Sequence, residues 1–250
     1  MSTLFISDLH LSPERPELTE LAVDFLQNNT QNTTALYILG DLFNTWLGDD
    51  VVPHEFSPLI EQLLLLKQHG IEIYFMVGNR DFMLGKDFAR RCGGQLLNDP
   101  TVIDLYGHEV LLMHGDSLCT DDIAYQRYRR WTRNKILQWC FLHLPQRFRQ
   151  RISDKIKQKS HKQKQYKSAM IMDVNHSAVE KALVEHKVGY LIHGHTHRPA
   201  IHQLNIENND VYRIVMGDWH DTISYLKCDA QQFNLVDHRI SENQSILKLS

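Results

Sequence analysis

Short apolar runs rich in β-branched residues recur along the chain, and each run ends in glycine or in a polar cluster. Between these runs, apolar residues recur with helical spacing over residues 16–28, 56–69 and 176–186. Strands that alternate with helices indicate a layered α/β fold. We expect strands at residues 4–6, 35–39, 71–77, 110–113, 190–192 and 212–216.

Residues 121–168 depart from this pattern, because they contain neither a strand-like run nor a glycine. The segment is typical of two helices split near Pro145. Fourteen of the 27 Lys and Arg residues lie between Arg127 and Lys167, where Asp154 is the only acid. Aromatic residues are interleaved with these cations. We expect a helical cap inserted into a single domain that spans residues 1–250.

Composition narrows the class of protein. The chain has 250 residues, of which 42% are hydrophobic and 23% charged, as expected for one large globular domain or two small ones. The four cysteines are widely spaced and form no Cys-x-x-Cys pair, which is typical of free thiols in a reducing compartment. We expect neither a signal peptide nor a transmembrane helix, and therefore a location in the cytosol or on the cytosolic side of a membrane.

Side chains that bind metal ions follow five of the expected strands. In open α/β folds, ligands bind beyond the carboxyl ends of the strands. Residues two apart in an extended chain point to the same side, so each Asp-x-His or His-x-His pair is expected to face one site. A mixture of oxygen and nitrogen donors without thiolates favours Mn²⁺, Fe²⁺ or Zn²⁺ over Ca²⁺. The candidate ligands are Asp8, His10, Asp41, Asn79, His114, His195 and His197.

The ordered set of motifs resembles the calcineurin-like metallophosphoesterases, and the resemblance spans residues 4 to about 220. It implies a β-sandwich flanked by helices and a site for two metal ions. Matched motif by motif, it implies that Asp8, His10, Asp41 and His197 hold one ion. It also implies that Asp41, Asn79, His114 and His195 hold the other, with Asp41 as the bridging and catalytic carboxylate. Asp81 and Asp116 are expected to orient these ligands, and Asp218 is expected to be structural.

Arg80 departs from the family pattern, in which Gly-Asn-His is common at this position. That histidine is thought to protonate the leaving group, which an arginine cannot do at neutral pH. An arginine can instead stabilise charge on a phosphoryl oxygen. We therefore expect Arg80 to be catalytic and the substrate to be a pyrophosphate, whose leaving phosphate needs no proton.

Longer strings narrow the resemblance to one branch of the family, the UDP-2,3-diacylglucosamine hydrolases. These strings are Ile6 to Leu11, Gly40 to Phe43 followed by Trp46, Gly78 to Phe82, His114 to Asp116, Met172 to Asn175 and His193 to Pro199. The resemblance implies two Mn²⁺ per subunit and water attack on the uridine-side phosphorus of UDP-2,3-diacylglucosamine. The products would be UMP and 2,3-diacylglucosamine 1-phosphate, an intermediate of lipid A biosynthesis.

The same resemblance gives the cap a role. Its aromatic residues would wall an acyl groove, and its cations would meet phosphates of the substrate or of the membrane. The protein would then be peripheral to the cytoplasmic face of the inner membrane. Lys164 stands where a small polar residue is expected. By family position, substrate contacts are expected from Asn79, Arg80, Asp122, Ser160, Lys164, Lys167 and His195.

Other functions remain open on the sequence alone. A nuclease of the same fold would also use a basic aromatic surface, although we expect no nucleic-acid partner. A protein phosphatase or a dinucleotide polyphosphate hydrolase is another alternative on this fold, and Arg80 and the cap disfavour the phosphatase. A non-catalytic scaffold usually lacks some of the ligands, all of which are present here. A membrane-binding module would leave the five motifs unexplained. We expect no obligate protein partner.

Overall fold

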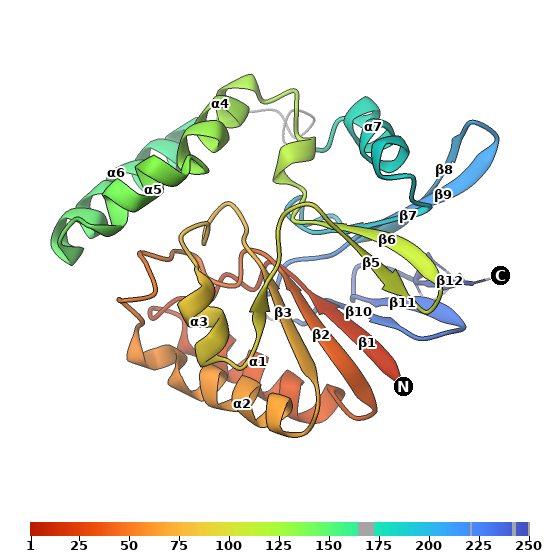
Figure 1. Cartoon of the computed structure of the whole chain (residues 1–250), viewed down its shortest axis with the longest axis horizontal. Coiled ribbons are helices and arrows are strands. Elements are labelled where there is room, and N and C mark those ends of the chain that lie inside the picture. Colours follow the sequence, from red (N-terminus) through yellow and green to blue (C-terminus); the bar gives the residue numbers. More distant parts are fainter. Residues whose placement is uncertain (165–172, 221, 242–243, 250) are drawn as a thin grey trace.

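Two β-sheets form the centre of the protein (Figure 1). The computed structural model describes residues 1–164, 173–220, 222–241 and 244–249, and for residues 159–164 it describes the backbone alone. The first sheet has the strand order β12-β11-β10-β1-β2-β3-β4, and the second has the order β5-β6-β7-β9-β8. The first sheet contains β1 (Ser2–Ile6), β2 (Thr33–Leu39), β3 (Glu72–Met76), β4 (Gln95–Leu96), β10 (Tyr225–Cys228), β11 (Gln232–Val236) and β12 (Ile246–Lys248). The second contains β5 (Thr101–Leu105), β6 (His108–Met113), β7 (Tyr190–His193), β8 (Ala200–Ile206) and β9 (Asn209–Val215).

Helices cover the outer faces of the two sheets. They are α1 (Pro16–Asn29), α2 (Ser57–Gln68), α3 (Lys86–Arg91) and α7 (His176–His186). Proline lies within the first turn of α1 and of α2, where its missing N–H costs no hydrogen bond. Gly70 follows α2 with φ 85°, a conformation that favours glycine after a helix.

The alternation of side chains along β1 explains how the layers pack. Leu4 and Ile6 point into a core shared with α1 and α2, whereas Phe5 points into a second core between the sheets. A third core lies between α7 and the second sheet, around Leu183 and Leu191. The structure thus confirms the expected β-sandwich flanked by helices.

All six expected strands and three expected helices are present, with ends shifted by at most a few residues. Six further strands and α3 were not expected. Five of these strands have only two to five residues and α3 has six, too short to show a period. The sixth, β8, has seven residues and was missed.

The expected pair of cap helices is wrong, because the described part of the cap contains three. They are α4 (Ile123–Thr132), α5 (Lys135–Leu142) and α6 (Gln146–Lys164), and they lie together to one side of the sheets (Figure 1). The additional break falls at Asn134, whose side-chain oxygen accepts hydrogen bonds from the N–H groups of Ile136 and Leu137 and so caps α5. Within the described residues, no helix has the length and apolar character needed to cross a bilayer.

Candidate metal centre

Loops at the carboxyl ends of β1, β2, β3, β6 and β7 carry the seven candidate ligands. Five of these residues have positive φ values: Asp8 (56°), His10 (51°), Asp41 (50°), His195 (67°) and His197 (57°). The expectation that each i, i+2 pair lies on extended chain is therefore wrong. Tight left-handed turns aim these side chains, and such conformations persist in non-glycine residues only where the surrounding structure enforces them.

One set of ligand atoms forms the His197 cluster, which comprises Asp8, His10 and His197. Nε2 of His197 lies 3.3 Å from Oδ1 of Asp8 and 3.2 Å from Nε2 of His10. Nε2 of His10 lies 3.9 Å from the same Asp8 oxygen. Three ligand atoms thus face one small volume, which has the size that a metal ion needs.

A second set forms the His114 cluster, which comprises Asp41, Asn79 and His114. Nε2 of His114 lies 3.0 Å from Oδ1 of Asn79 and 3.8 Å from Oδ1 of Asp41. The other Asp41 oxygen, Oδ2, lies 3.9 Å from Nδ1 of His10. Asp41 therefore has one oxygen near His114 and the other near His10, a residue of the His197 cluster. Asp8 also lies close enough to Asp41 and His114 to share a metal ion with them.

His195 lies beside the His114 cluster. Its backbone N–H donates to Oδ2 of Asp8 at 2.9 Å. Its ring centroid is 5.1 Å from that of His114. The structure therefore brings all seven candidate ligands to one site.

Two buried atoms test whether a cation fits this site. Nδ1 of His10 is buried without a hydrogen-bond partner among the described residues, and Oδ1 of Asp8 is buried with only the 3.3 Å contact to His197, which lacks good hydrogen-bond geometry. A buried polar atom without a partner costs about 1–3 kcal/mol, and a cation would relieve that cost. Carboxylate, imidazole and amide donors suit a divalent transition metal, so the residues fit the group that the fold implies.

Glycines next to the ligands allow their close approach. A Cβ atom on Gly78 would overlap the Asp41 carboxylate, and one on Gly194 would overlap the Asp8 carboxylate. Neither position could carry a larger side chain without displacing a candidate ligand.

Burial and charge set the protonation of the histidines. Burial lowers the pKa of His10 and of His195 to about 3, so both imidazoles are neutral. Burial also disfavours protonation of His114, but the carboxylates of Asp41, Asp8 and Asp116 outweigh it and raise the pKa to about 9. For His197, contacts with Asp218 and Asp8 outweigh burial and raise the pKa to about 10. In the absence of metal ions, the protons on His114 and His197 therefore neutralise part of the negative charge of the neighbouring carboxylates.

Two buried carboxylates hold the loops in place. Asp81 accepts hydrogen bonds from the backbone N–H groups of Gly78 (2.7 Å), Asp41 (3.3 Å) and Phe43 (3.3 Å). Asp116 accepts from the hydroxyl of Tyr125 at 2.6 Å and from Nε of Arg129 at 2.9 Å. These contacts agree with the expectation that Asp81 and Asp116 orient the candidate ligands and do not bind metal themselves.

Arg80 lies at the edge of the His114 cluster. Its backbone N–H donates to Oδ1 of Asp41 at 2.7 Å, and its Nη1 donates to Oδ1 of Asn44 at 3.1 Å. The hydrogen bond to Asn44, on the loop after β2, thus orients the guanidinium, and Arg80 remains partly exposed.

Asp218 has a larger role than the sequence suggested. Its Oδ2 accepts a hydrogen bond from Nδ1 of His197 at 3.2 Å, and its Oδ1 accepts from Arg239 at 2.8 Å. Asp218 lies just beyond the carboxyl end of β9, as the candidate ligands lie just beyond the ends of their strands. That signal could have identified it.

The cap is joined to loops that carry the site. Nη2 of Arg133 donates to the carbonyl of Gly78 at 2.9 Å, and Tyr125 lies with its ring centroid 6.1 Å from that of His195. Asp122 caps α4, since its side chain accepts from the N–H of Tyr125 at 3.0 Å. Ser160 and Lys164 lie on α6, where only the backbone is described. Lys167 lies outside the described residues.

Comparisons with known proteins agree with this geometry. The family described as "Calcineurin-like phosphoesterase" matches residues 1–199. A UDP-2,3-diacylglucosamine hydrolase of Serratia proteamaculans is 48% identical over 236 residues, covering 94% of this chain and 98% of the relative. One of Histophilus somni is 49% identical over 234 residues, covering 94% of this chain and 99% of the relative. A solved Vacuolar Protein Sorting 29 from Cryptosporidium parvum is 12% identical with a TM-score of 0.47, covering 100% and 97% of the two chains. The chain therefore belongs to the calcineurin-like phosphoesterase family and, within it, to the group that contains these two hydrolase relatives.

Proposed function

We propose that this protein hydrolyses the pyrophosphate bond of UDP-2,3-diacylglucosamine, giving UMP and 2,3-diacylglucosamine 1-phosphate for lipid A biosynthesis. The observation that carries the proposal is the joint presence of a complete ligand set and of Arg80, whose backbone N–H donates to Asp41 and whose guanidinium lies beside the metal centre, bound to Asn44. The two hydrolase relatives, each nearly half identical along most of this chain, support the choice of substrate.

Two Mn²⁺ ions are the proposed cofactors. Asp8, His10, Asp41 and His197 would hold one, and Asp41, Asn79, His114 and His195 the other. When bound, such ions activate water for attack and neutralise charge on the phosphoryl oxygens. Asp41 serves catalysis by fixing the spacing of the two positions, since its oxygens face both clusters.

Arg80 would bind the leaving phosphate. Attack on the uridine-side phosphorus expels a sugar phosphate, whose charge a guanidinium fork can stabilise through paired hydrogen bonds. The contact with Asn44 at 3.1 Å positions the guanidinium in advance, which lowers the entropic cost of binding.

The cap would hold the acylated sugar. Its described contacts with loops of the metal centre support its assignment to the same single domain. Its apolar side chains are unusually exposed, among them Trp131 (67%), Ile136 (72%) and Trp139 (60%). Monomeric proteins rarely expose such a group unless it meets a lipid, a membrane or a partner. Together with the surrounding cations, it supports a peripheral location on the cytoplasmic face of the inner membrane.

Four substrate contacts are proposed from the cap in addition to those of Asn79, Arg80 and His195. Ser160 and Lys164 lie one helical turn apart on α6, so they share a face of that helix. Lys167, outside the described residues, is proposed as a contact by family position. Asp122 would act at the start of the cap, where it already fixes the first turn of α4.

A substrate comparison tests the proposal. Purified protein with Mn²⁺ is assayed on UDP-2,3-diacylglucosamine, on an alkyl phosphate monoester and on single-stranded nucleic acid, with release of UMP followed for the first. We expect the pyrophosphate to be cleaved at least about a hundredfold faster than the monoester, because no group replaces the missing acid. Preference for the monoester or for nucleic acid would overturn the proposed substrate, and the latter would favour a nuclease.

A further inference from the structure

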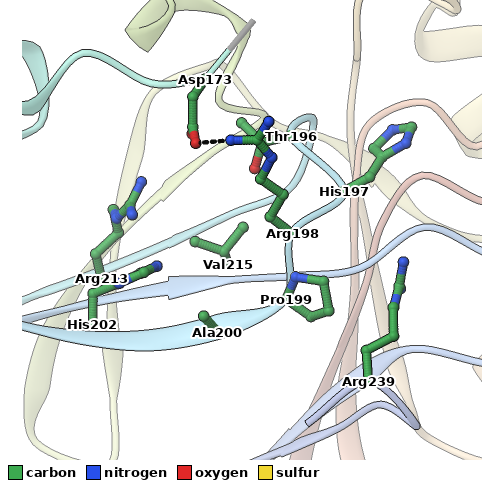
Figure 2. A pocket seen from close by; sticks show the side chains of 10 residues that line it. All are labelled: Asp173, Thr196, His197, Arg198, Pro199, Ala200, His202, Arg213, Val215 and Arg239. Atoms are coloured by element: carbon green, nitrogen blue, oxygen red, sulfur yellow. Dashed lines mark hydrogen bonds and ion pairs between the residues drawn. The ribbon is translucent and has the colours of Figure 1, made fainter. Parts of the chain in front are cut away.

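A cavity of about 370 Å³ lies beside His197, on the side of the second sheet (Figure 2). Its wall includes residues from the start of β8 and from the end of β9. In this antiparallel pair, Ala200 lies opposite Val215 and His202 lies opposite Arg213. The cavity thus extends from the metal centre along one face of the sheet.

Most of the charges around the cavity are already neutralised. Arg198 donates to the carboxylate of Asp173. Arg239 is bound to Asp237 (2.7 Å) and to Asp218 (2.8 Å). These pairs leave the cavity without a strong excess of positive charge, so it does not resemble a general anion site.

Arg213 is the exception. Within the part of the chain that the structure describes, its guanidinium has no hydrogen-bond or ion-pair partner, although the residue is half-buried. Burial lowers its pKa. Asp173, whose charge attracts Arg213, is already bound to Arg198, so the guanidinium of Arg213 is open to a ligand that supplies acceptors.

The cap lies on the other side of the metal centre. Described contacts of the cap reach Gly78 and Asp116, which adjoin the His114 cluster. The cavity instead adjoins His197. A substrate whose phosphates lie across both clusters would therefore direct one end under the cap and the other into the cavity.

We propose that this cavity holds the nucleoside half of the substrate, with Arg213 donating hydrogen bonds to carbonyl oxygens of the pyrimidine base. The proposal rests on the proposed function, which places a uridine at that end. A planar base has two features to recognise, an apolar face and carbonyl acceptors at its edge. Pro199 and Ala200, both partly exposed, provide apolar surface, and Arg213 provides a rigid fork of donors at the far end (Figure 2).

The test compares Arg213→Met and Arg213→Lys with Arg91→Ala, an exposed arginine on α3, as the matched control. Binding of UMP, uridine and inorganic phosphate is measured by calorimetry on the metal-loaded full chain, alongside KM for UDP-2,3-diacylglucosamine. We expect Arg213→Met to weaken UMP binding and to raise KM about tenfold, with Arg213→Lys in between and the control unchanged. Uridine should compete with UMP for the wild-type protein.

Three results would overturn the nucleoside site. One is an Arg213→Met variant with the wild-type melting temperature and unchanged UMP affinity. Another is loss of phosphate binding that equals the loss of UMP binding, which would identify an anion site. The third is failure of uridine to compete. Turnover is a separate readout: a wild-type protein that binds UMP through Arg213 but does not cleave the substrate would sink the proposed function and leave the nucleotide site standing.

Discussion

Nδ1 of His197 lies 3.2 Å from Oδ2 of Asp218, while Nε2 on the other side of the ring faces Asp8 at 3.3 Å. One hydrogen bond therefore fixes both the orientation and the tautomer of a candidate ligand. We expect Asp218→Asn to weaken metal binding about 10–100-fold, because an amide holds the ring less strongly. Equilibrium dialysis with Mn²⁺ measures this loss. Asp210→Asn, at an exposed carboxylate on β9, is the control, and equal affinities of the two variants would contradict the role of Asp218.

Metal binding should release protons. Without ions, the pKa is about 9 for His114 and about 10 for His197, and each must lose its proton before its nitrogen can bind a metal. Both pKa values are raised, so the protons are held at neutral pH and are lost as the pH rises through 9–10. Apparent Mn²⁺ affinity should consequently increase from pH 6 to pH 9. Calorimetry in buffers of different ionisation enthalpy counts the protons, and a count of zero at pH 7 would contradict this account.

The sequence predicted the fold well where residues alternate strongly. Side chains along β1 alternate between two cores, with Leu4 and Ile6 in one and Phe5 in the other. The strand period predicted from the sequence therefore matches the observed burial. The sequence did not predict the break between α4 and α5 at Asn134. That break depends on one side chain, which accepts hydrogen bonds from the N–H groups of Ile136 and Leu137.

The site was predictable in its ligands but not in its geometry. Strand ends identified the ligands because parallel strands bring their carboxyl ends to one edge. The left-handed turns at Asp8 and His197 were not predictable, since neither is a residue type that requires positive φ. The sequence also could not show that Arg213 has no hydrogen-bond or ion-pair partner among the described residues, because this depends on which side chains meet across β8 and β9.

Gly194 should tolerate no side chain. A Cβ atom there would overlap the Asp8 carboxylate and the Ser7 side chain, both nearly inaccessible to solvent. We expect Gly194→Ala to lower kcat about a hundredfold, the scale of a 1 Å misplacement of catalytic groups. Gly189→Ala is the matched control, since nothing lies within 4 Å of its Cβ position. Equal rates for both variants, measured by UMP release, would show that the loop can shift at no cost.

Arg80 should act through its donor fork and not only through its charge. Arg80→Lys keeps the charge but loses the paired donors and the hydrogen bond from Nη1 to Asn44. We expect kcat on the pyrophosphate to fall about 10²–10³-fold, as for loss of one preorganised donor at a developing charge. Metal affinity should stay within twofold to threefold, since the arginine side chain is not a ligand. A lysine variant with the wild-type kcat would mean that charge alone suffices.

Arg149 should hold the cap onto the body of the protein. It is the one buried residue in the described part of the cap, residues 123–158, at 4% exposure. Its Nη1 donates to the carbonyl of Leu47 at 2.8 Å, and its guanidinium is paired with Asp50. Arg149→Met removes these bonds at a cost of about 1–3 kcal/mol, which the cap, with no apolar core of its own in α4 or α5, cannot replace.

The loss of stability in Arg149→Met should be confined to the cap. Limited proteolysis should cut the cap of Arg149→Met faster, and KM for the lipid substrate should rise, while the melting of the two sheets changes little. Arg147→Met, two residues away on the exposed side of the same helix, removes the same charge and is the control. Equal proteolysis of the two variants would show that the cap is held by its contacts to Asp116 and Gly78 alone.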